Sequence, residues 1–251
     1  MSTHHSSLIT HHGIFVTGTD TGVGKTLVTC ALIRAIAARG KRVVGMKPVA
    51  AGAQAGEQGV LSEDVELLLA AGNVNAPRSQ VNPYCFVPAI APHLAARAAG
   101  IDIELAKIAA AYRELAAVAE FVVVEGAGGF RVPLNAREDM ADLAEQLRLP
   151  VVLVVGMRLG CLNHALLTAE AIRSKGLTLA AWCANHIDPA MTLAEENVGA
   201  LTERLSAPLL GRISHMPAPD PRAVAALLDP SALALVTHGV PASDSAAPEG
   251  E

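Results

Sequence analysis

Aromatic and charged residues are scarce in this sequence: aromatic side chains make up 3% of its 251 residues and charged ones 17%. The formal net charge is −5 at pH 7, and no stretch concentrates Lys and Arg. A nucleic-acid-binding surface needs clustered positive charge to neutralise phosphates, and RNA-binding surfaces usually add aromatic rings on which bases stack. The composition therefore argues against a nucleic-acid partner.

The sequence also lacks long apolar runs and closely spaced cysteine pairs. Its longest strongly apolar run, Leu149 to Met157, is well short of the roughly 20 residues that a membrane-spanning helix requires. No basic segment followed by an apolar stretch opens the chain, so no secretory signal is predicted. The four cysteines are scattered without a Cys-x-x-Cys pair, which fits a reducing compartment. We therefore expect a cytoplasmic protein without a membrane partner.

Short apolar runs alternate along the chain with stretches of helical periodicity. Half of the residues are apolar, which is enough for a well-filled core. Strands that are apolar on both faces and alternate with helices predict an α/β fold, in which a mostly parallel sheet is covered by helices on both faces. The predicted strands are Ile14 to Thr17, Val43 to Val49, Phe121 to Glu125, Val151 to Gly156, Leu179 to Ala184 and Leu209 to Ile213.

Three longer helices are predicted from periodicity and from residues that favour helix ends. They are Lys25 to Arg39, Ile103 to Glu120, and a helix that runs from near Thr192 to about Leu205. Gly40 would end the first helix, and Asp102 would cap the second. A capping-box pattern of Thr192 and Glu195 would open the third.

Both ends of the sequence lack periodicity. Residues 1–12 include four His and are expected to form a flexible tail, although capture of a metal by these His remains an alternative. Residues 242–251 are Ala, Ser, Pro, Asp, Glu and Gly and are expected to be disordered. No repeat or linker divides the chain between these ends, so residues 13–241 are predicted to form one domain.

The first predicted strand is followed by the sequence GTDTGVGKT, Gly18 to Thr26, and then directly by a helix. This order of strand, loop and helix is the context of a phosphate-binding loop, or P-loop. Gly24 would let the backbone approach the phosphates, Lys25 would reach their oxygens, and the Thr26 hydroxyl would bind Mg²⁺. The usual pattern has a glycine where Thr19 stands. A glycine-rich turn with a chance Gly-Lys-Thr is the alternative, which the flanking strand and helix disfavour.

Three further charged residues follow or precede predicted elements. Lys47 lies at the carboxyl end of the second strand, where it is either a surface charge or a second cation for a transferred phosphate, and the residues alone leave both open. Glu125 follows four apolar residues and resembles the carboxylate that meets Mg²⁺ in P-loop proteins. Asp64 lies near the start of a short helix that Ser62 could cap, and by itself predicts only a favourable charge at that helix end.

These motifs, in this order, resemble those of the dethiobiotin synthetase family. The resemblance covers roughly Ile14 to Met216. It rests on GTDTGVGKT, KPVAAG, VNPY at Val81 to Tyr84, VEGAGG, LGCLNHALLT at Leu159 to Thr168, and APLLG at Ala207 to Gly211. It implies a single-domain P-loop fold and an ATP-dependent ligase that uses Mg²⁺. Members of the family close the ureido ring of dethiobiotin from 7,8-diaminononanoate and CO₂, and release ADP and phosphate.

The resemblance also implies roles for individual residues. Lys25 and Lys47 would be the catalytic cations, and Thr26, Asp64 and Glu125 would surround Mg²⁺. The nucleotide would contact the P-loop, the two carboxylates, the glycines after the third strand and the ends of the fifth and sixth strands. These residues are Thr21, Gly22, Val23, Gly24, Lys25, Thr26, Leu27, Asp64, Glu125, Gly126, Ala127, Gly128, Asn185, His186, Ser214, His215 and Met216.

For the substrate, the resemblance implies a site shared between the two chains of a homodimer. Ala51 would lie near the reacting end of the substrate, and the helix start formed by Gly160, Cys161, Leu162 and Asn163 would bind the chain carboxylate from the partner subunit. The alternative for this segment is an ordinary helix start with Asn163 as the cap. Family members often have Ser in place of Ala51, and some have an acidic residue in place of Gly22. The resemblance also leads us to expect Asp in place of His186. His186 is therefore given no catalytic role.

Two other classes of P-loop protein were weighed. A partitioning or regulatory ATPase that switches dimerisation usually has a second Lys early in the loop, whereas Thr19, Asp20 and Thr21 stand here. A glutamine-dependent amidase of cobalamin synthesis needs an additional domain with a nucleophilic Cys, for which this chain has no room. The sequence favours dethiobiotin synthesis over both.

Overall fold

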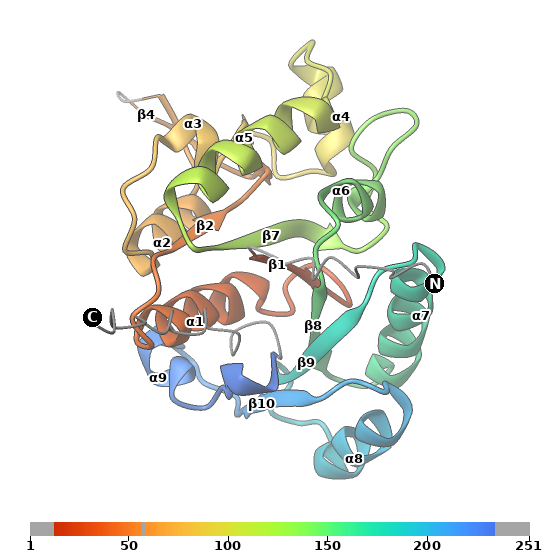
Figure 1. The fold of residues 1–251 in the computed structure, drawn as a ribbon. Coiled ribbons are helices and arrows are strands. Elements are labelled where there is room, and N and C mark those ends of the chain that lie inside the picture. The colour runs from red at the N-terminus through yellow and green to blue at the C-terminus, as the bar shows by residue number, and fades with distance from the viewer. Residues whose placement is uncertain (1–12, 57–58, 234–251) are drawn as a thin grey trace, which may run out of the picture.

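The computed structural model describes residues 13–56 and 59–233 and contains a six-stranded parallel sheet (Figure 1). The strands lie in the order β10-β9-β8-β1-β7-β2, and every pair of neighbours is parallel. The predicted α/β fold is confirmed. The strands are β1 (Gly13–Gly18), β2 (Val43–Met46), β7 (Phe121–Gly129), β8 (Val151–Met157), β9 (Leu179–His186) and β10 (Leu209–Ile213).

Helices cover both faces of the sheet (Figure 1). Side chains that alternate along β1 enter different cores: Ile14 and Val16 pack on one side, and Phe15 packs on the other. The first side is covered by α1 (Lys25–Ala37), α2 (Glu63–Ala71) and α9 (Pro221–Ala225). The second side is covered by α5 (Leu105–Val118), α6 (Met140–Leu147), α7 (Cys161–Ser174) and α8 (Ala194–Arg204). α4 (Pro92–Ala98) joins the same core but packs on a smaller sheet described below.

The strand order brings the predicted site residues together toward the carboxyl ends of neighbouring strands. β1 lies between β7 and β8, and β2 lies on the far side of β7. Val16 of β1 is in register with Glu125 of β7, and Met46 of β2 is in register with the neighbouring Val124. The P-loop and Lys47, which follow the carboxyl ends of β1 and β2, therefore lie on either side of Glu125 in β7. The carboxyl ends of parallel strands are where α/β folds usually bind ligands.

The second predicted strand, Val43 to Val49, is divided in two in the structure. β2 ends at Met46, and β3 (Val49–Ala51) belongs to a separate two-stranded parallel sheet with β6 (Tyr84–Phe86). Pro48 explains the break, because proline has no N–H with which to continue a sheet ladder. The remaining elements are a short antiparallel hairpin, β4 (Gln54–Gly56) and β5 (Gly59–Leu61), the helix α3 (Arg78–Val81) and the 3₁₀ turn Pro230–Ala232.

Two of the predicted helix caps are wrong. α5 begins at Leu105 with Glu104 as its N-cap, because residues before it are extended and bury Ile103 in the core. Asp102 therefore does not cap it. α8 begins at Ala194 after Leu193, whose left-handed backbone has a φ of 53°, and no side chain caps the helix. The predicted capping box of Thr192 and Glu195 is not formed.

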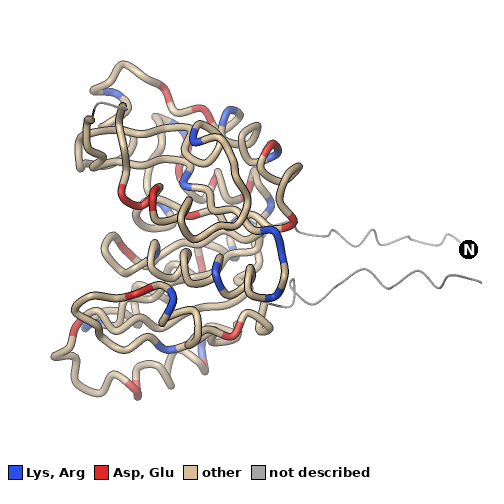
Figure 2. The backbone as a smooth tube through the Cα atoms, turned by 90° about the vertical axis from the view of Figure 1, so that its left-hand side faces the viewer, with Lys and Arg blue, Asp and Glu red and all other residues tan. Residues whose placement is uncertain are grey.

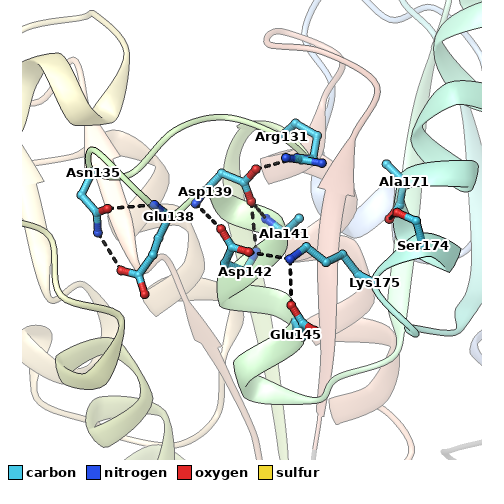
Figure 3. Close-up of polar contacts among 10 residues, drawn as sticks. All are labelled: Arg131, Asn135, Glu138, Asp139, Ala141, Asp142, Glu145, Ala171, Ser174 and Lys175. Atoms are coloured by element: carbon cyan, nitrogen blue, oxygen red, sulfur yellow. Dashed lines mark hydrogen bonds and ion pairs between the residues drawn. The ribbon is translucent and has the colours of Figure 1, made fainter.

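The capping box in the structure opens α6, which sequence analysis did not single out (Figure 3). The Asp139 side chain accepts hydrogen bonds from the backbone N–H groups of Ala141 and Asp142, and the Asp142 carboxylate accepts one from the Asp139 N–H at 2.8 Å. Lys175, at the end of α7, donates to Asp142 at 2.6 Å and to Glu145 at 2.8 Å. This network joins the two helices beside the sheet.

Other element ends also differ from the prediction, and those of α1 and β7 lie next to the site. α1 ends at Ala37, two residues before the predicted Arg39, and Gly40 adopts a φ of 81° in the turn that follows, as a residue that stops a helix should. β7 continues through Gly129 instead of ending at Glu125, because its glycines remain paired beside β1, with Gly18 opposite Gly129. Glu125 is thus inside a strand and not at its end.

Residues of both charges are distributed along the described part of the chain. Figure 2 shows Lys and Arg interspersed with Asp and Glu along the backbone. Within residues 13–56 and 59–233, no helix is both long and apolar enough to cross a membrane. The two predicted tails, residues 1–12 and 242–251, lie outside the described residues, as does the end of the predicted domain from residue 234 to 241.

The cysteines provide a test of this core. Burial raises the pKa of Cys30 to about 12 and that of Cys183 to about 12, whereas Cys85 of β6 is only half buried. Because the thiolate is the reactive form, a thiol reagent at pH 8 should label Cys85 before Cys30 and Cys183, which should react roughly a hundredfold or more slowly. Mass spectrometry of labelled peptides measures this. Fast labelling of Cys183 in the native protein would contradict the described core, and labelling in urea is the control.

Candidate active site

The P-loop between β1 and α1 is held in place by Asn185 at the end of β9. The Asn185 Nδ2 donates a hydrogen bond to the Val23 carbonyl at 2.8 Å. Gly24 has a φ of 90°, and a Cβ on it would lie 2.2 Å from the Asn185 Nδ2. Both its backbone conformation and this close approach therefore require glycine. Gly22 has a φ of 75° but open space around it.

Asp20 is a P-loop residue whose role the motif did not indicate. Its Oδ1 accepts from the Thr21 backbone N–H at 2.7 Å, and its backbone carbonyl accepts from the Lys25 Nζ at 2.9 Å. Its Oδ2 accepts from Arg158 Nη2 at 2.5 Å. Arg158 lies between β8 and α7, so this pair joins the P-loop to the segment that precedes Gly160.

Four predicted site residues form one polar cluster: Thr26 of α1, Asp64 of α2, Glu125 of β7, and Lys47, which lies between β2 and β3. The Lys47 Nζ donates to Asp64 Oδ2 at 2.8 Å and to Glu125 Oε1 at 2.6 Å. The Thr26 hydroxyl lies 2.7 Å from Glu125 Oε1 and 3.0 Å from Asp64 Oδ1. Asp64 is in the first turn of α2, where Ser62 is the N-cap residue but makes no side-chain cap hydrogen bond. The structure therefore brings Lys47 into the site, which the residues alone had left open.

Two members of this cluster are buried, whereas Asp64 is partly exposed. Glu125 is fully buried, and the Lys47 side chain is 6% exposed. Burial alone would lower the pKa of Lys47, but the carboxylates of Glu125 and Asp64 outweigh it and hold that pKa above its ordinary value. Burial would raise the pKa of Asp64, but the charge and hydrogen bond of Lys47 and the hydrogen bond of Thr26 hold it below its ordinary value. Both side chains are therefore charged.

Lys25 has a different environment from Lys47. Its burial, assisted by the positive charge of Lys47, lowers its pKa to about 8 despite Glu125, Asp64 and Asp20 nearby. An ammonium group desolvated in this way is not fully compensated by its neighbours. A polyanion bound beside Lys25 would supply the missing negative charge.

The oxygen atoms of the cluster suit a hard divalent cation. Glu125 Oε2 is buried and has no hydrogen-bond partner, although such atoms are usually paired. Together with Asp64 and the Thr26 hydroxyl it forms a set of oxygen donors, which Mg²⁺ prefers. Among residues 13–56 and 59–233, no three His, Cys, Asp or Glu side chains gather in a group that could hold a metal. A metal here would therefore depend on two carboxylates, the hydroxyl and other oxygens.

A cavity of about 690 Å³ opens over the cluster. Its polar end is formed by the P-loop and the cluster, and its other walls are apolar. The predicted residues that line it are Thr21, Gly22, Gly24, Lys25, Thr26, Lys47, Ala51, Asp64, Glu125, Ala127 and Gly128. Sequence analysis missed the rest of the wall, Val49, Ala89 to Pro92 and Val132. The proline-rich sequence from Val87 to Pro92 was the available signal of a loop there.

A second cavity of about 260 Å³ adjoins the first, and Gly22 and Gly24 line both. It is lined by residues predicted to contact the nucleotide, together with Ile187, Ile213 and Pro219, which were not predicted. The predicted residues are Leu27, Asn185, His186, Ser214, His215 and Met216. Val23 and Gly126 line neither cavity: Val23 is buried beneath the loop, and Gly126 packs against Phe15.

The predicted substrate segment from Gly160 to Asn163 opens α7 but lines neither of these cavities. Gly160 is the N-cap residue, with a φ of 95° and no side-chain cap. The alternative in which Asn163 caps the helix is therefore wrong, since Asn163 lies inside its first turn. Leu159, just before the helix, is 95% exposed.

Known protein families and sequences were compared with this chain. A family model described as an AAA domain matches residues 12–223. A curated relative from Nitrosospira multiformis, named ATP-dependent dethiobiotin synthetase BioD, is 58% identical over 217 residues, which are 86% of this chain and 94% of the relative. A relative of the same name from Aromatoleum aromaticum is 55% identical and covers 85% of this chain and 95% of its own length.

Solved structures are similar at the level of the fold. A ParA family ATPase from Chlorobium tepidum has a TM-score of 0.53 at 13% identity and covers 91% of this chain and 99% of its own. The MinC:MinD cell division protein complex of Aquifex aeolicus has a TM-score of 0.51 at 17% identity, covering 92% and 98%. These likenesses show a shared P-loop fold and nothing further. The identities above 50% along most of the sequence are decisive: the chain belongs to the ATP-dependent dethiobiotin synthetase family.

Proposed function

We propose that this chain is an ATP-dependent dethiobiotin synthetase, which closes the ureido ring of dethiobiotin from 7,8-diaminononanoate and CO₂. The observation that carries the proposal is the convergence of Lys25, Thr26, Lys47, Asp64 and Glu125 at one end of the large cavity. The assignment of the substrates rests on the relatives that bear this name.

The proposed reaction has three steps. One amine of the substrate adds to CO₂ and loses a proton, which gives a carbamate. A carbamate oxygen attacks the γ-phosphorus of ATP and displaces ADP, so that a carbamic–phosphoric anhydride forms. The second amine attacks the carbamoyl carbon, loses a proton and expels phosphate, which closes the five-membered ring. Negative charge is concentrated on phosphoryl and carbamate oxygens throughout, so fixed cations and backbone amides supply most of the catalysis.

The two lysines have separate places in this scheme. Lys25 opens α1 directly after the P-loop and faces the large cavity beside the amides of the loop, where triphosphate oxygens would bind. Lys47 comes from the other side of the cluster, between Asp64 and Glu125. In this position its ammonium group stabilises charge on the carbamate oxygen that attacks the γ-phosphorus and then bridges the two groups.

The metal site of the proposal consists of Thr26, Asp64 and Glu125. Their oxygens are the donors described above, including the unpartnered Glu125 Oε2. A Mg²⁺ ion bound there would neutralise charge on the β- and γ-phosphates. The protein fixes these donors on three separate elements: the start of α1, the start of α2 and the strand β7.

The apolar wall of the large cavity suits the hydrocarbon chain of the diamine. Val49 and Ala51 come from β3, and Ala91 and Pro92 come from the start of α4. Ala51 has no hydroxyl with which to hold the reacting end of the substrate. A backbone amide or a water molecule would replace that hydrogen bond.

We further propose that the enzyme is a homodimer with a shared substrate site. Leu159 is 95% exposed, and Leu166 and Leu167 of α7 are also exposed apolar residues next to the predicted carboxylate-binding segment. Burial of these side chains against a second copy would be favourable. The uncapped N–H groups at the start of α7 would then bind the substrate carboxylate of the partner subunit.

Product formation tests the proposed activity. Purified protein incubated with ATP, Mg²⁺, bicarbonate and 7,8-diaminononanoate should form dethiobiotin, ADP and phosphate, measured by mass spectrometry, with each component omitted in turn as a control. The Lys47→Ala variant should form product on the order of 10²–10³-fold more slowly while it still binds ATP. ATP hydrolysis that does not depend on the diamine, without dethiobiotin, would contradict the proposal and favour a switch ATPase.

A pair of glycine variants tests the P-loop geometry. Both Gly22→Ala and Gly24→Ala place a side chain at positive φ, but only a Cβ at residue 24 meets Asn185. Gly24→Ala should therefore lose far more affinity for ATP than Gly22→Ala, whose backbone strain costs about 1–2 kcal/mol. Isothermal titration calorimetry measures both affinities. Equal losses in the two variants would show that the contact with Asn185 does not shape the nucleotide site.

A further inference from the structure

Asn82 of the VNPY sequence is buried next to Lys47 and has no role in the reaction described above. It is 8% exposed, and it follows α3 at the point where the chain turns toward β6. Its side-chain Nδ2 donates to two backbone carbonyl groups, those of Lys47 at 2.6 Å and of Tyr84 at 2.9 Å. We propose that Asn82 is a positioning residue that sets the place of the Lys47 ammonium group in phosphoryl transfer.

The backbone of Lys47 lacks the sheet partners that its neighbours have. β2 ends at Met46, and β3 begins at Val49 in a different sheet. Between them the Lys47 N–H donates to the Val81 carbonyl at 2.8 Å, and the Lys47 carbonyl accepts from Asn82. Both backbone polar groups of Lys47 are therefore held by the same two consecutive residues. The segment 81–82 takes the place of a neighbouring strand at this point.

The buried hydrogen bond from Asn82 fixes the position of the Lys47 backbone. An unpartnered buried carbonyl is unfavourable, so loss of the Asn82 amide would favour a shift of the Lys47 backbone toward other donors. The lysine side chain makes contacts of 2.6 and 2.8 Å with Glu125 and Asp64. A backbone shift would change where its ammonium group lies relative to a transferred phosphate. The inference rests on the proposed function of Lys47.

The test uses a variant of the same shape. Asn82→Asp places a carboxylate oxygen opposite two carbonyl oxygens, and Asn82→Ala removes the donors without adding charge. Either variant should lower kcat for dethiobiotin formation by about 10- to 100-fold, with the KM for ATP changed by less than about twofold. Circular dichroism checks folding, and Asn82→Ala decides the kinetic test if Asn82→Asp does not fold.

Asn73→Asp is the matched control. Asn73 also donates its side-chain amide to a backbone carbonyl, that of Lys41, but it acts at the beginning of β2, whereas Lys47 lies just beyond the end. This variant should keep a kcat close to that of the wild type. An equal loss of kcat in Asn73→Asp and Asn82→Asp would overturn the inference, because the effect would then be a general weakening of β2.

A double-variant comparison separates positioning from general damage. If Asn82 acts through Lys47, Asn82→Asp should lower the residual turnover of Lys47→Ala by no more than about twofold. The same fold loss in the wild-type and Lys47→Ala backgrounds would overturn the inference.

Hydrogen exchange gives a readout that does not depend on activity. Exchange at the Lys47 amide should be faster in Asn82→Asp than in the wild type and unchanged in Asn73→Asp, measured by mass spectrometry of short peptides that cover residues 44–50. Unchanged exchange in Asn82→Asp would overturn the inference. If the wild-type protein forms no dethiobiotin, the proposed function fails, and this measurement still decides whether Asn82 positions Lys47.

Discussion

The buried ion pair between Lys47 and Glu125 is the interaction on which the rest of the site depends. Glu125 is fully buried in β7, and its Oε1 is 2.6 Å from the Lys47 Nζ. A carboxylate in such a place has a large desolvation cost unless a cation and hydrogen-bond donors compensate for it. Lys47 and the Thr26 hydroxyl supply this compensation. The buried pair contributes more to holding the side chains of the site in one geometry than to the overall stability of the fold.

The sheet order explains how residues distant in sequence form this pair. β7 lies between β1 and β2, so a carboxylate on β7 meets the P-loop on one side and the end of β2 on the other. The break at Pro48 then releases the chain from the main sheet, and β3 lines the cavity where the substrate chain is proposed to bind. On the opposite side of β1, Asn185 of β9 closes the P-loop and borders the second cavity. One strand order therefore separates the proposed nucleotide and substrate regions.

Local sequence signals predicted the elements whose residues specify them directly. The P-loop, α1 and the main strands follow from glycine placement and apolar runs, and they are close to their predicted positions. Cap predictions failed where tertiary packing decides the backbone: burial of Ile103 keeps Asp102 from capping α5, and Leu193 takes a left-handed conformation before α8. Pro48 marked the break after β2, but the apolar residues around it suggested a continuous strand.

The site was predictable to the extent that a motif carries its chemistry in its own residues. Lys25, Thr26 and Glu125 belong to such motifs, whereas Asp64 needed the resemblance to a family before it could be placed in the site. Asn82 and Asp20 could not be assigned from the sequence, because their partners, Lys47 and Arg158, are brought to them only by the fold. A residue that supports another one across 35 or 138 positions leaves no local pattern.

The coupling between Lys47 and Glu125 tests the central claim most directly. It is measured from the free energies of unfolding in urea of four proteins: the wild type, Lys47→Met, Glu125→Gln and the double variant. If the two charges compensate each other in a dry site, each single variant should be destabilised by about 3–5 kcal/mol. The double variant should then be more stable than the sum of the two losses predicts, by at least about 2 kcal/mol. Losses that add to within about 0.5 kcal/mol would show that the two groups are independent and would contradict the account.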